Sequence, residues 1–160
     1  MRLERLEHLS DLPAAEWNTL VPDHHPFLSH AFLSALERHG CVSEAVGWQP
    51  WHVVCRDDHG QVLGAAPLYL KTHSYGEFVF DWGWAEAYRR QGLSYYPKLV
   101  SAIPYTPVTS PRLLLMPNQS HPQQTAQAIV NFTLGECRRH RLPSSHWLFP
   151  GRDETKPIDV

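Results

Sequence analysis

The sequence has few cysteines. Only three are present, Cys41, Cys55 and Cys137, and none of them forms a Cys-x-x-Cys pair. An odd number at wide spacing argues against a disulfide framework and against a cysteine-ligated zinc site, and it is typical of a reducing compartment. Eleven histidines occur, but none has the spacing of a zinc-protease helix. We therefore predict no metal site.

An excess of positive charge and a long apolar run are also absent. Fourteen Lys and Arg residues stand against sixteen Asp and Glu residues, for a net charge of −2, so no DNA-binding footprint is present. The most apolar run, Val62 to Leu70, is interrupted by Gly64 and Pro67 and is far too short for a membrane span. The N-terminus has no apolar stretch of signal-peptide length. These observations predict a soluble, cytoplasmic protein.

Glycine is scarce as well, with nine residues in 160. The sequence has no Gly-x-Ser-x-Gly elbow, and neither Cys41 nor Cys55 has an identifiable base, which disfavours a nucleophilic hydrolase. No glycine-rich loop precedes a long helix, as a phosphate-binding loop requires.

Hydrophobic residues make up 42% of the chain, with six Trp and fourteen Pro, which indicates one globular domain. Alternating and helical periodicities predict helices and strands in mixed order. Ser29 is a good N-cap for one of the helices. The predicted helices span 13–20, 30–39, 84–91 and 122–140, and the predicted strands span 51–56, 62–71, 77–81, 98–103, 112–116 and 145–149. The expected fold class is α+β, a central mixed sheet in which an antiparallel hairpin is followed by a β-α-β crossover over residues 112–149.

The segment from Lys71 to Arg112 is rich in aromatic rings with interspersed polar groups. Apolar walls and a few orienting polar contacts are what a ligand cleft needs. Each ring taken singly also fits ordinary core packing. The segment as a whole predicts a binding cleft.

Several motifs occur in the order seen in a bacterial family of predicted N-acyltransferases that is similar to the Fem proteins. Pro-Phe-Leu-Ser-His-Ala-Phe-Leu at 26–33 resembles the family's early signature, and the other motifs lie in the aromatic segment. The chain resembles this family from about residue 10 to 150. The other motifs are His-Ser-Tyr-Gly-Glu-Phe-Val-Phe-Asp-Trp at 73–82, Trp-Ala-Glu-Ala-Tyr at 84–88, Tyr-Tyr-Pro-Lys-Leu at 95–99 and Ile-Pro-Tyr-Thr-Pro-Val-Thr at 103–109.

The resemblance implies a GNAT-like acyl-CoA N-acyltransferase fold and a protein of two such lobes that share a cleft. Residues 1–150 would be the N-terminal lobe, and the polar residues 151–160 the truncated start of a missing second lobe. Fem proteins add amino acids to peptidoglycan precursors, so the implied function is transfer of an acyl or aminoacyl group to an amine, with this lobe inactive alone. The implied acyl donors are acetyl-CoA or another acyl-CoA, or aminoacyl-tRNA.

Amine attack on an activated acyl carbonyl needs a proton acceptor and a donor for the oxyanion. Within the resembling motifs, Glu77 and Asp81 are the candidate acceptors. The remaining candidates are substrate-binding residues, of which Lys98 and Arg112 would hold a phosphate or carboxylate and the others would line the cleft: Tyr75, Tyr95, Tyr96, Tyr105 and Thr106.

Two alternatives remain open. The first is a non-catalytic binding or assembly domain with the same fold, and the second is a stand-alone acetyl-CoA acetyltransferase. For the second, Arg89–Ser94 nearly matches the GNAT pyrophosphate signature but departs from it at Ser94, and Pro97 would interrupt the required helix. The loop 117–121 lies at a better place, before the long helix, but has no glycines.

The absence of the second lobe would leave an apolar face of this lobe exposed, which predicts a homodimer through that face.

Overall fold

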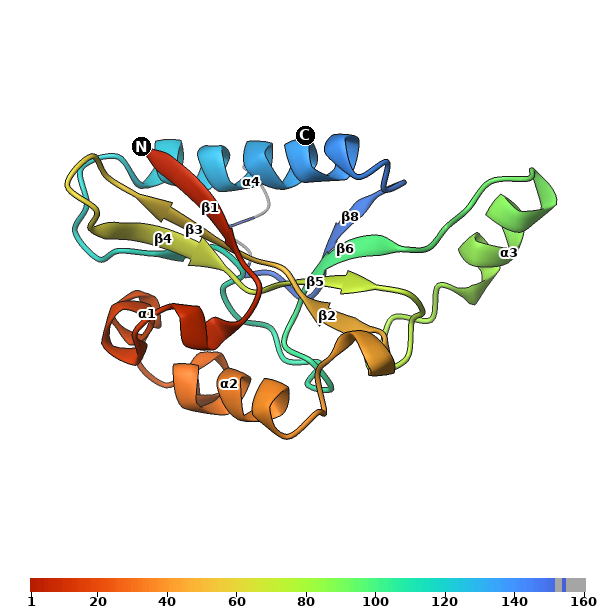
Figure 1. Ribbon diagram of the computed structural model, residues 1–160, viewed down its shortest axis with the longest axis horizontal. Helices are drawn as coiled ribbons and strands as arrows, with labels where there is room; N and C mark the ends of the chain where they lie inside the picture. Colours follow the sequence, from red (N-terminus) through yellow and green to blue (C-terminus); the bar gives the residue numbers. More distant parts are fainter. Residues whose placement is uncertain (152–153, 155–160) are drawn as a thin grey trace.

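The computed structural model describes residues 1–151 and residue 154 (Figure 1). Over these residues the chain forms four α-helices, three short 3-10 turns and eight strands. The helices are α1 (Ala14–Leu20), α2 (His30–Arg38), α3 (Trp82–Arg90) and α4 (Pro122–Arg139). The strands are β1 (Arg2–Leu6), β2 (Trp48–Pro50), β3 (His52–Arg56), β4 (Val62–Ala66), β5 (Leu68–Lys71), β6 (Lys98–Ser101), β7 (Leu114–Leu115) and β8 (Ser145–Trp147).

The strands form two four-stranded sheets, in the orders β1-β3-β4-β7 and β2-β5-β6-β8. One long hairpin contributes to both sheets, because β2 continues through Trp51 into β3 and β4 continues through Pro67 into β5. Proline has no N–H for the ladder, so the strand pairing is interrupted there. The Trp51 N–H donates to the Leu68 carbonyl at 2.8 Å and keeps the two halves joined. The predicted α+β class is confirmed.

The first sheet is buried on both faces, with α4 on one side and α1 and α2 on the other (Figure 1). Residues of β3 alternate between the two layers. Val53 and Cys55 pack in the core beneath α4, whereas Val54 packs with the leucines of α1 and α2. Such two-sided burial explains why the three central residues of β3, Val53 to Cys55, are all apolar.

The crossover is present, but its parallel pair differs from the prediction. The last strand, β8, pairs in parallel with β6, with Val100 opposite His146, and lies in a different sheet from β7. The strand predicted at 112–116 is reduced to the two residues of β7, which pair with β4. Pairing between distant segments is not encoded in local periodicity, which explains this error.

The strand predicted at 77–81 was wrong, because these residues form an irregular loop before α3. Gly76 and Phe78 have φ angles of +80° and +59°, which interrupt any extended strand. The strand β1, which pairs with β3, was missed. Of the predicted loose tail, only Gly151 and Glu154 lie within the described residues.

No helix among the described residues is long and apolar enough to cross a membrane.

Candidate functional site

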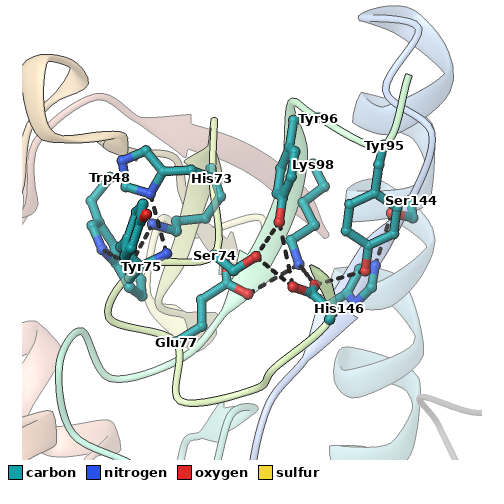
Figure 2. A network of polar contacts seen from close by, with 12 residues as sticks. Trp48, His73, Ser74, Tyr75, Glu77, Tyr95, Tyr96, Lys98, Ser144 and His146 are labelled. Atoms are coloured by element: carbon teal, nitrogen blue, oxygen red, sulfur yellow. Dashed lines mark hydrogen bonds and ion pairs between the residues drawn. The ribbon is translucent and has the colours of Figure 1, made fainter. Parts of the chain in front are cut away.

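A buried ion cluster lies where the loop between β5 and α3 meets β6 (Figure 2). Lys98, the first residue of β6, has no exposed side-chain surface. Its Nζ lies 2.5 Å from Asp81 Oδ2 and 3.0 Å from Glu77 Oε2. Because a buried ammonium needs ionic partners, this pair of carboxylates fixes the loop against the sheet. The structure thus brings together three of the residues predicted from the sequence.

Asp81 accepts hydrogen bonds on both oxygens. The Tyr95 hydroxyl donates to Oδ2 at 2.7 Å, and the Ser74 hydroxyl donates to Oδ1. Burial alone would raise the pKa of Asp81, but hydrogen bonds from Lys98, Ser74 and Tyr95 outweigh it and lower the pKa to about 2. So low a pKa makes this carboxylate a weak base. Its contacts suit it to hold the loop in place.

Glu77, unlike Asp81, has one carboxylate oxygen that accepts no hydrogen bond from the described residues. Its Oε1 has no hydrogen-bond partner among the described residues, although only 2% of Glu77 is exposed. Burial raises the pKa of Glu77, and the attraction of Lys98 offsets this only in part. Of the two predicted proton acceptors, Glu77 is therefore the stronger base.

A pocket of about 550 Å³ opens between this cluster and α3. The predicted residues Tyr75, Tyr95 and Tyr96 line it, and the Tyr96 hydroxyl contacts that of Ser74 at its inner side. Sequence reasoning did not assign His73, Ser74 or Trp82 to the site, although all lie inside the aromatic segment. The pocket is lined by His73, Ser74, Tyr75, Trp82, Ala85, Glu86, Arg89, Leu93, Ser94, Tyr95 and Tyr96.

The wall of the pocket that carries Tyr75 is hydrogen-bonded to a second buried lysine, Lys71. Lys71 Nζ and Trp48 Nε1 both donate to the Tyr75 carbonyl at 3.1 Å. Lys71 Nζ also lies 3.8 Å from the centre of the Trp48 ring, in a cation–π contact. Lys71 was missed because a lysine at the end of an apolar strand usually points to solvent.

Gly76 completes this wall in a left-handed conformation. A Cβ atom on Gly76 would lie 2.6 Å from the Tyr105 ring, and the φ of +80° disfavours any side chain. We expect Gly76→Ala to lower the free energy of unfolding by about 1–2 kcal/mol, since Tyr105 is part-exposed and its ring can shift. Urea unfolding followed by circular dichroism measures this. Gly83→Ala, which meets no atom within 4 Å, is the control and should leave stability within about 0.5 kcal/mol or raise it.

The remaining predicted residues lie outside the pocket lining. Tyr105 packs against Trp48 and donates its hydroxyl to the Cys41 carbonyl at 2.8 Å. The Thr106 hydroxyl donates to the Pro104 carbonyl at 3.1 Å. The structure does not bring these two side chains to the Lys98 cluster.

Arg112 is completely buried and is bonded to its own chain. Its guanidinium donates to the Leu148 carbonyl at 2.6 Å, to the Val108 carbonyl at 2.9 Å and to the Ser110 hydroxyl at 2.5 Å. Burial lowers the pKa of Arg112 to about 10. These contacts tie the loop before β7 to the end of β8.

The two loops considered for acetyl-CoA differ in geometry. Arg89 and Arg90 form the last turn of α3, so the segment 89–94 lies at a carbonyl end. Phosphates bind at amide ends, which excludes a pyrophosphate loop there. The segment 117–121 does precede α4, but the Gln119 side-chain amide donates to the Leu63 carbonyl and its oxygen accepts from Thr125. This loop is therefore held by contacts within the chain.

Comparison with solved structures supports the fold. A tetramutant of the BH1408 protein from Bacillus halodurans superposes with a TM-score of 0.51 at 8% sequence identity, over 92% of this chain and 81% of that one. At this identity the likeness concerns the fold alone.

Comparison with curated proteins gives no match. A family described as FemAB-like, peptidoglycan biosynthesis/recognition, matches residues 8–159, which is nearly the whole chain. The match includes the loop with Ser74, Glu77 and Asp81 as well as β6 with Lys98. The chain belongs to the FemAB-like family.

Proposed function

We propose that this chain binds an amine-bearing cell-wall precursor in the α3 pocket and presents the amine for transfer of an acyl or aminoacyl group. The observation that carries the proposal is the pocket of about 550 Å³ between α3 and the buried Lys98 cluster. Its aromatic walls offer apolar contact, and its tyrosine and serine hydroxyls offer orienting hydrogen bonds. Membership of a family of peptidoglycan biosynthesis or recognition supports the choice of substrate.

Acyl transfer to an amine forms one C–N bond and breaks the bond between the acyl carbon and the donor's sulfur or oxygen. The amine nitrogen loses a proton, and the leaving thiolate or ribose oxygen gains one. Glu77 is the acceptor of that proton in this proposal, because Oε1 is free and its pKa is raised. The hydroxyl of Tyr96 would orient the substrate. The donor would be an acyl-CoA or an aminoacyl-tRNA.

Residues 1–150 would form the N-terminal lobe of a two-lobed, cytoplasmic enzyme. A shared cleft would explain why this lobe offers substrate-binding residues but no glycine-rich loop for a donor.

One observation favours the second candidate function, a binding domain without catalysis. Glu77 is only 2% exposed, and Asp81 is fully engaged by Lys98, Ser74 and Tyr95. Catalysis would require the Ser74 loop to move so that the amine reaches Glu77, whereas binding requires no movement. The two functions share the pocket and differ in turnover.

The test is calorimetric titration with a muramyl pentapeptide that carries a free lysine amine, with and without acetyl-CoA. We expect Trp82→Ala to weaken pentapeptide binding about tenfold, because Trp82 lines the pocket. Trp84→Ala is the matched control, since Trp84 is in the same helix, is similarly exposed and lies outside the pocket lining.

Binding that both variants weaken equally, or no binding at all, would refute the pocket assignment. Because a lone N-terminal lobe is expected to be inactive, binding without acyl transfer by this chain agrees with both candidate functions, whereas transfer by this chain would refute the non-catalytic domain. Saturable binding of acetyl-CoA alone would instead support the stand-alone acetyltransferase.

A further inference from the structure

The pocket beside α3 has an inner and an outer part. The inner part lies at the Lys98 cluster, where the hydroxyls of Ser74 and Tyr96 are in contact. The outer part holds the two lining rings that face water, Tyr75 and Trp82, which are 72% and 60% exposed. The amine of the proposed function needs only the inner part, so the outer part is free to bind another portion of the same ligand.

We propose that the outer part binds a pyranose ring of the precursor, stacked on the face of Trp82, while the amine of the attached peptide lies in the inner part. This inference rests on the proposed function and adds a sugar to the substrate class. Membership of a family of peptidoglycan biosynthesis or recognition supports a sugar, because peptidoglycan is a polymer of amino sugars that carry peptides.

One face of α3 forms the wall of the outer part. Trp82, Ala85, Glu86 and Arg89 recur at helical spacing, and all four line the pocket. The wall covers about two helical turns, roughly 10 Å along the axis. Ala85 has the smallest side chain of the four and leaves space beside the Trp82 ring. A single sugar ring can therefore lie on Trp82 with its substituents at Glu86 and Arg89.

The Trp82 ring is held in place and still exposed. It contacts the ring of Phe80, with centroids 5.4 Å apart, and Phe80 lies outside the pocket lining. The face of an aromatic ring carries partial negative charge, which attracts the partially positive C–H groups on one face of a pyranose. Stacking of the sugar also removes apolar surface of Trp82 from water.

Glu86 and Arg89 add hydrogen-bonding groups that are fixed in position. Arg89 donates from Nε and Nη2 to the two oxygens of Glu86, both at 2.7 Å. Nη1 of Arg89 takes no part in this pair, and Glu86 Oε2 has a second lone pair. The pair thus offers donors and an acceptor side by side, which matches sugar hydroxyl and N-acetyl groups.

The same pair distinguishes a sugar from a lipid chain and from an anion on this wall. A hydrocarbon chain would remove water from Glu86 and Arg89 without replacing its hydrogen bonds. An anion would meet the Glu86 carboxylate beside Arg89, and Arg89 lies in the last turn of α3, where the helix dipole disfavours negative charge. A neutral ring rich in hydroxyls has neither disadvantage.

Calorimetric titration of the full chain with two ligands tests the inference: the muramyl pentapeptide, and the same pentapeptide without its sugar. We expect the wild type to bind the muramyl pentapeptide about tenfold more tightly, the contribution of one good aromatic contact. Trp82→Ala should bind both ligands alike, within about twofold of the wild-type affinity for the sugar-free peptide. Trp82→Tyr keeps a ring for stacking and should retain most of the preference.

Trp84→Ala is the control, because Trp84 lies outside the pocket lining, and it should keep the full preference for the sugar. Circular dichroism checks that each variant is folded. If the wild type binds both ligands equally, or if Trp82→Ala keeps the preference, the sugar site is wrong and the proposed function stands. If neither ligand binds, the proposed function fails and the sugar site with it. Uridine monophosphate that binds the wild type but not Trp82→Ala would assign the ring to a nucleobase instead.

Discussion

Replacement of Lys98 by methionine is expected to lower the free energy of unfolding by about 3–5 kcal/mol, because it leaves two buried carboxylates without their cation. Asp81 and Glu77 are 5% and 2% exposed, and both pair with Lys98 Nζ. Methionine fills a similar volume, so the loss reflects charge and not a cavity. Urea unfolding at pH 7 measures the change.

The loss of unfolding free energy caused by Lys98→Met should depend on pH. In the wild-type protein the pKa of Asp81 is lowered from 3.8 to about 2, so its stabilising contribution is complete above about pH 4 and is lost as the pH falls through 2. Without Lys98 the carboxylate of Asp81 keeps the hydrogen bonds from Ser74 and Tyr95 but loses its buried cation, and its pKa should rise. The variant therefore gains stability relative to the wild type on acidification from pH 7 to pH 4.

A triple variant separates the unpaired charges from the loss of Lys98 itself. Adding Glu77→Gln and Asp81→Asn to Lys98→Met removes both buried charges and should restore at least half of the lost stability. If Lys98→Met costs less than about 1 kcal/mol at pH 7, water must reach the cluster, and its description as a buried network is wrong.

The local signals in the sequence predicted most elements correctly. The Ser29 hydroxyl accepts the Phe32 N–H at the start of α2, as its N-cap position predicted. The strands predicted at 51–56 and 62–71 form the expected antiparallel hairpin, in which β3 pairs with β4. These features depend on neighbours in the chain, which a sequence shows directly. The parallel pairing of β6 with β8 depends on residues more than forty positions apart, which it does not.

The wrong strand at 77–81 shows how a correct pattern led to an incorrect element. The alternation of Glu-Phe-Val-Phe-Asp is real, but its polar residues point inward. Glu77 and Asp81 are buried, whereas Phe78 and Phe80 are 50% and 76% exposed. The carboxylates point inward because they pair with the buried ammonium of Lys98. A partner so distant in sequence cannot be recognised from a period of two.

Only the part of the candidate site that comes from one continuous segment could be predicted, because contacts between distant residues are not visible in the sequence. Tyr75, Tyr95 and Tyr96 gather at the pocket because they flank α3 in one continuous segment. Arg112 belongs to the same segment by sequence, but its guanidinium donates to the carbonyls of Leu148 and Val108. The residue type suggested an anion ligand, and only the fold shows that the chain's own carbonyls satisfy it.

The two buried lysines lie opposite each other, since Lys71 on β5 pairs in register with Lys98 on β6. Their surroundings differ. Lys98 has two carboxylate partners, whereas Lys71 donates to one carbonyl and contacts the face of Trp48. Burial lowers the pKa of Lys71 to about 8, with attraction to Glu77 and repulsion from Lys98 opposing each other. Its charge is therefore a cost to the folded state.

We expect Lys71→Met to raise the free energy of unfolding by about 2–3 kcal/mol at pH 7, the opposite sign to Lys98→Met. Methionine can pack against Trp48, and the Tyr75 carbonyl keeps its hydrogen bond from Trp48 Nε1. In the wild-type protein Lys71 loses its proton near pH 8 when folded and near 10.5 when unfolded. The unfolded chain thus binds more protons between these values, and stability rises with pH across this window.

The variant should lack that rise, so the two stability curves converge as the pH approaches 10.5. Urea unfolding at pH 7, 8, 9 and 10 measures both effects. Lys71→Arg is the control, because arginine stays charged over the whole range and should lower stability at every pH. A Lys71→Met protein that is less stable than the wild type at pH 7 would show that the ammonium contributes more through Tyr75 and Trp48 than its burial costs.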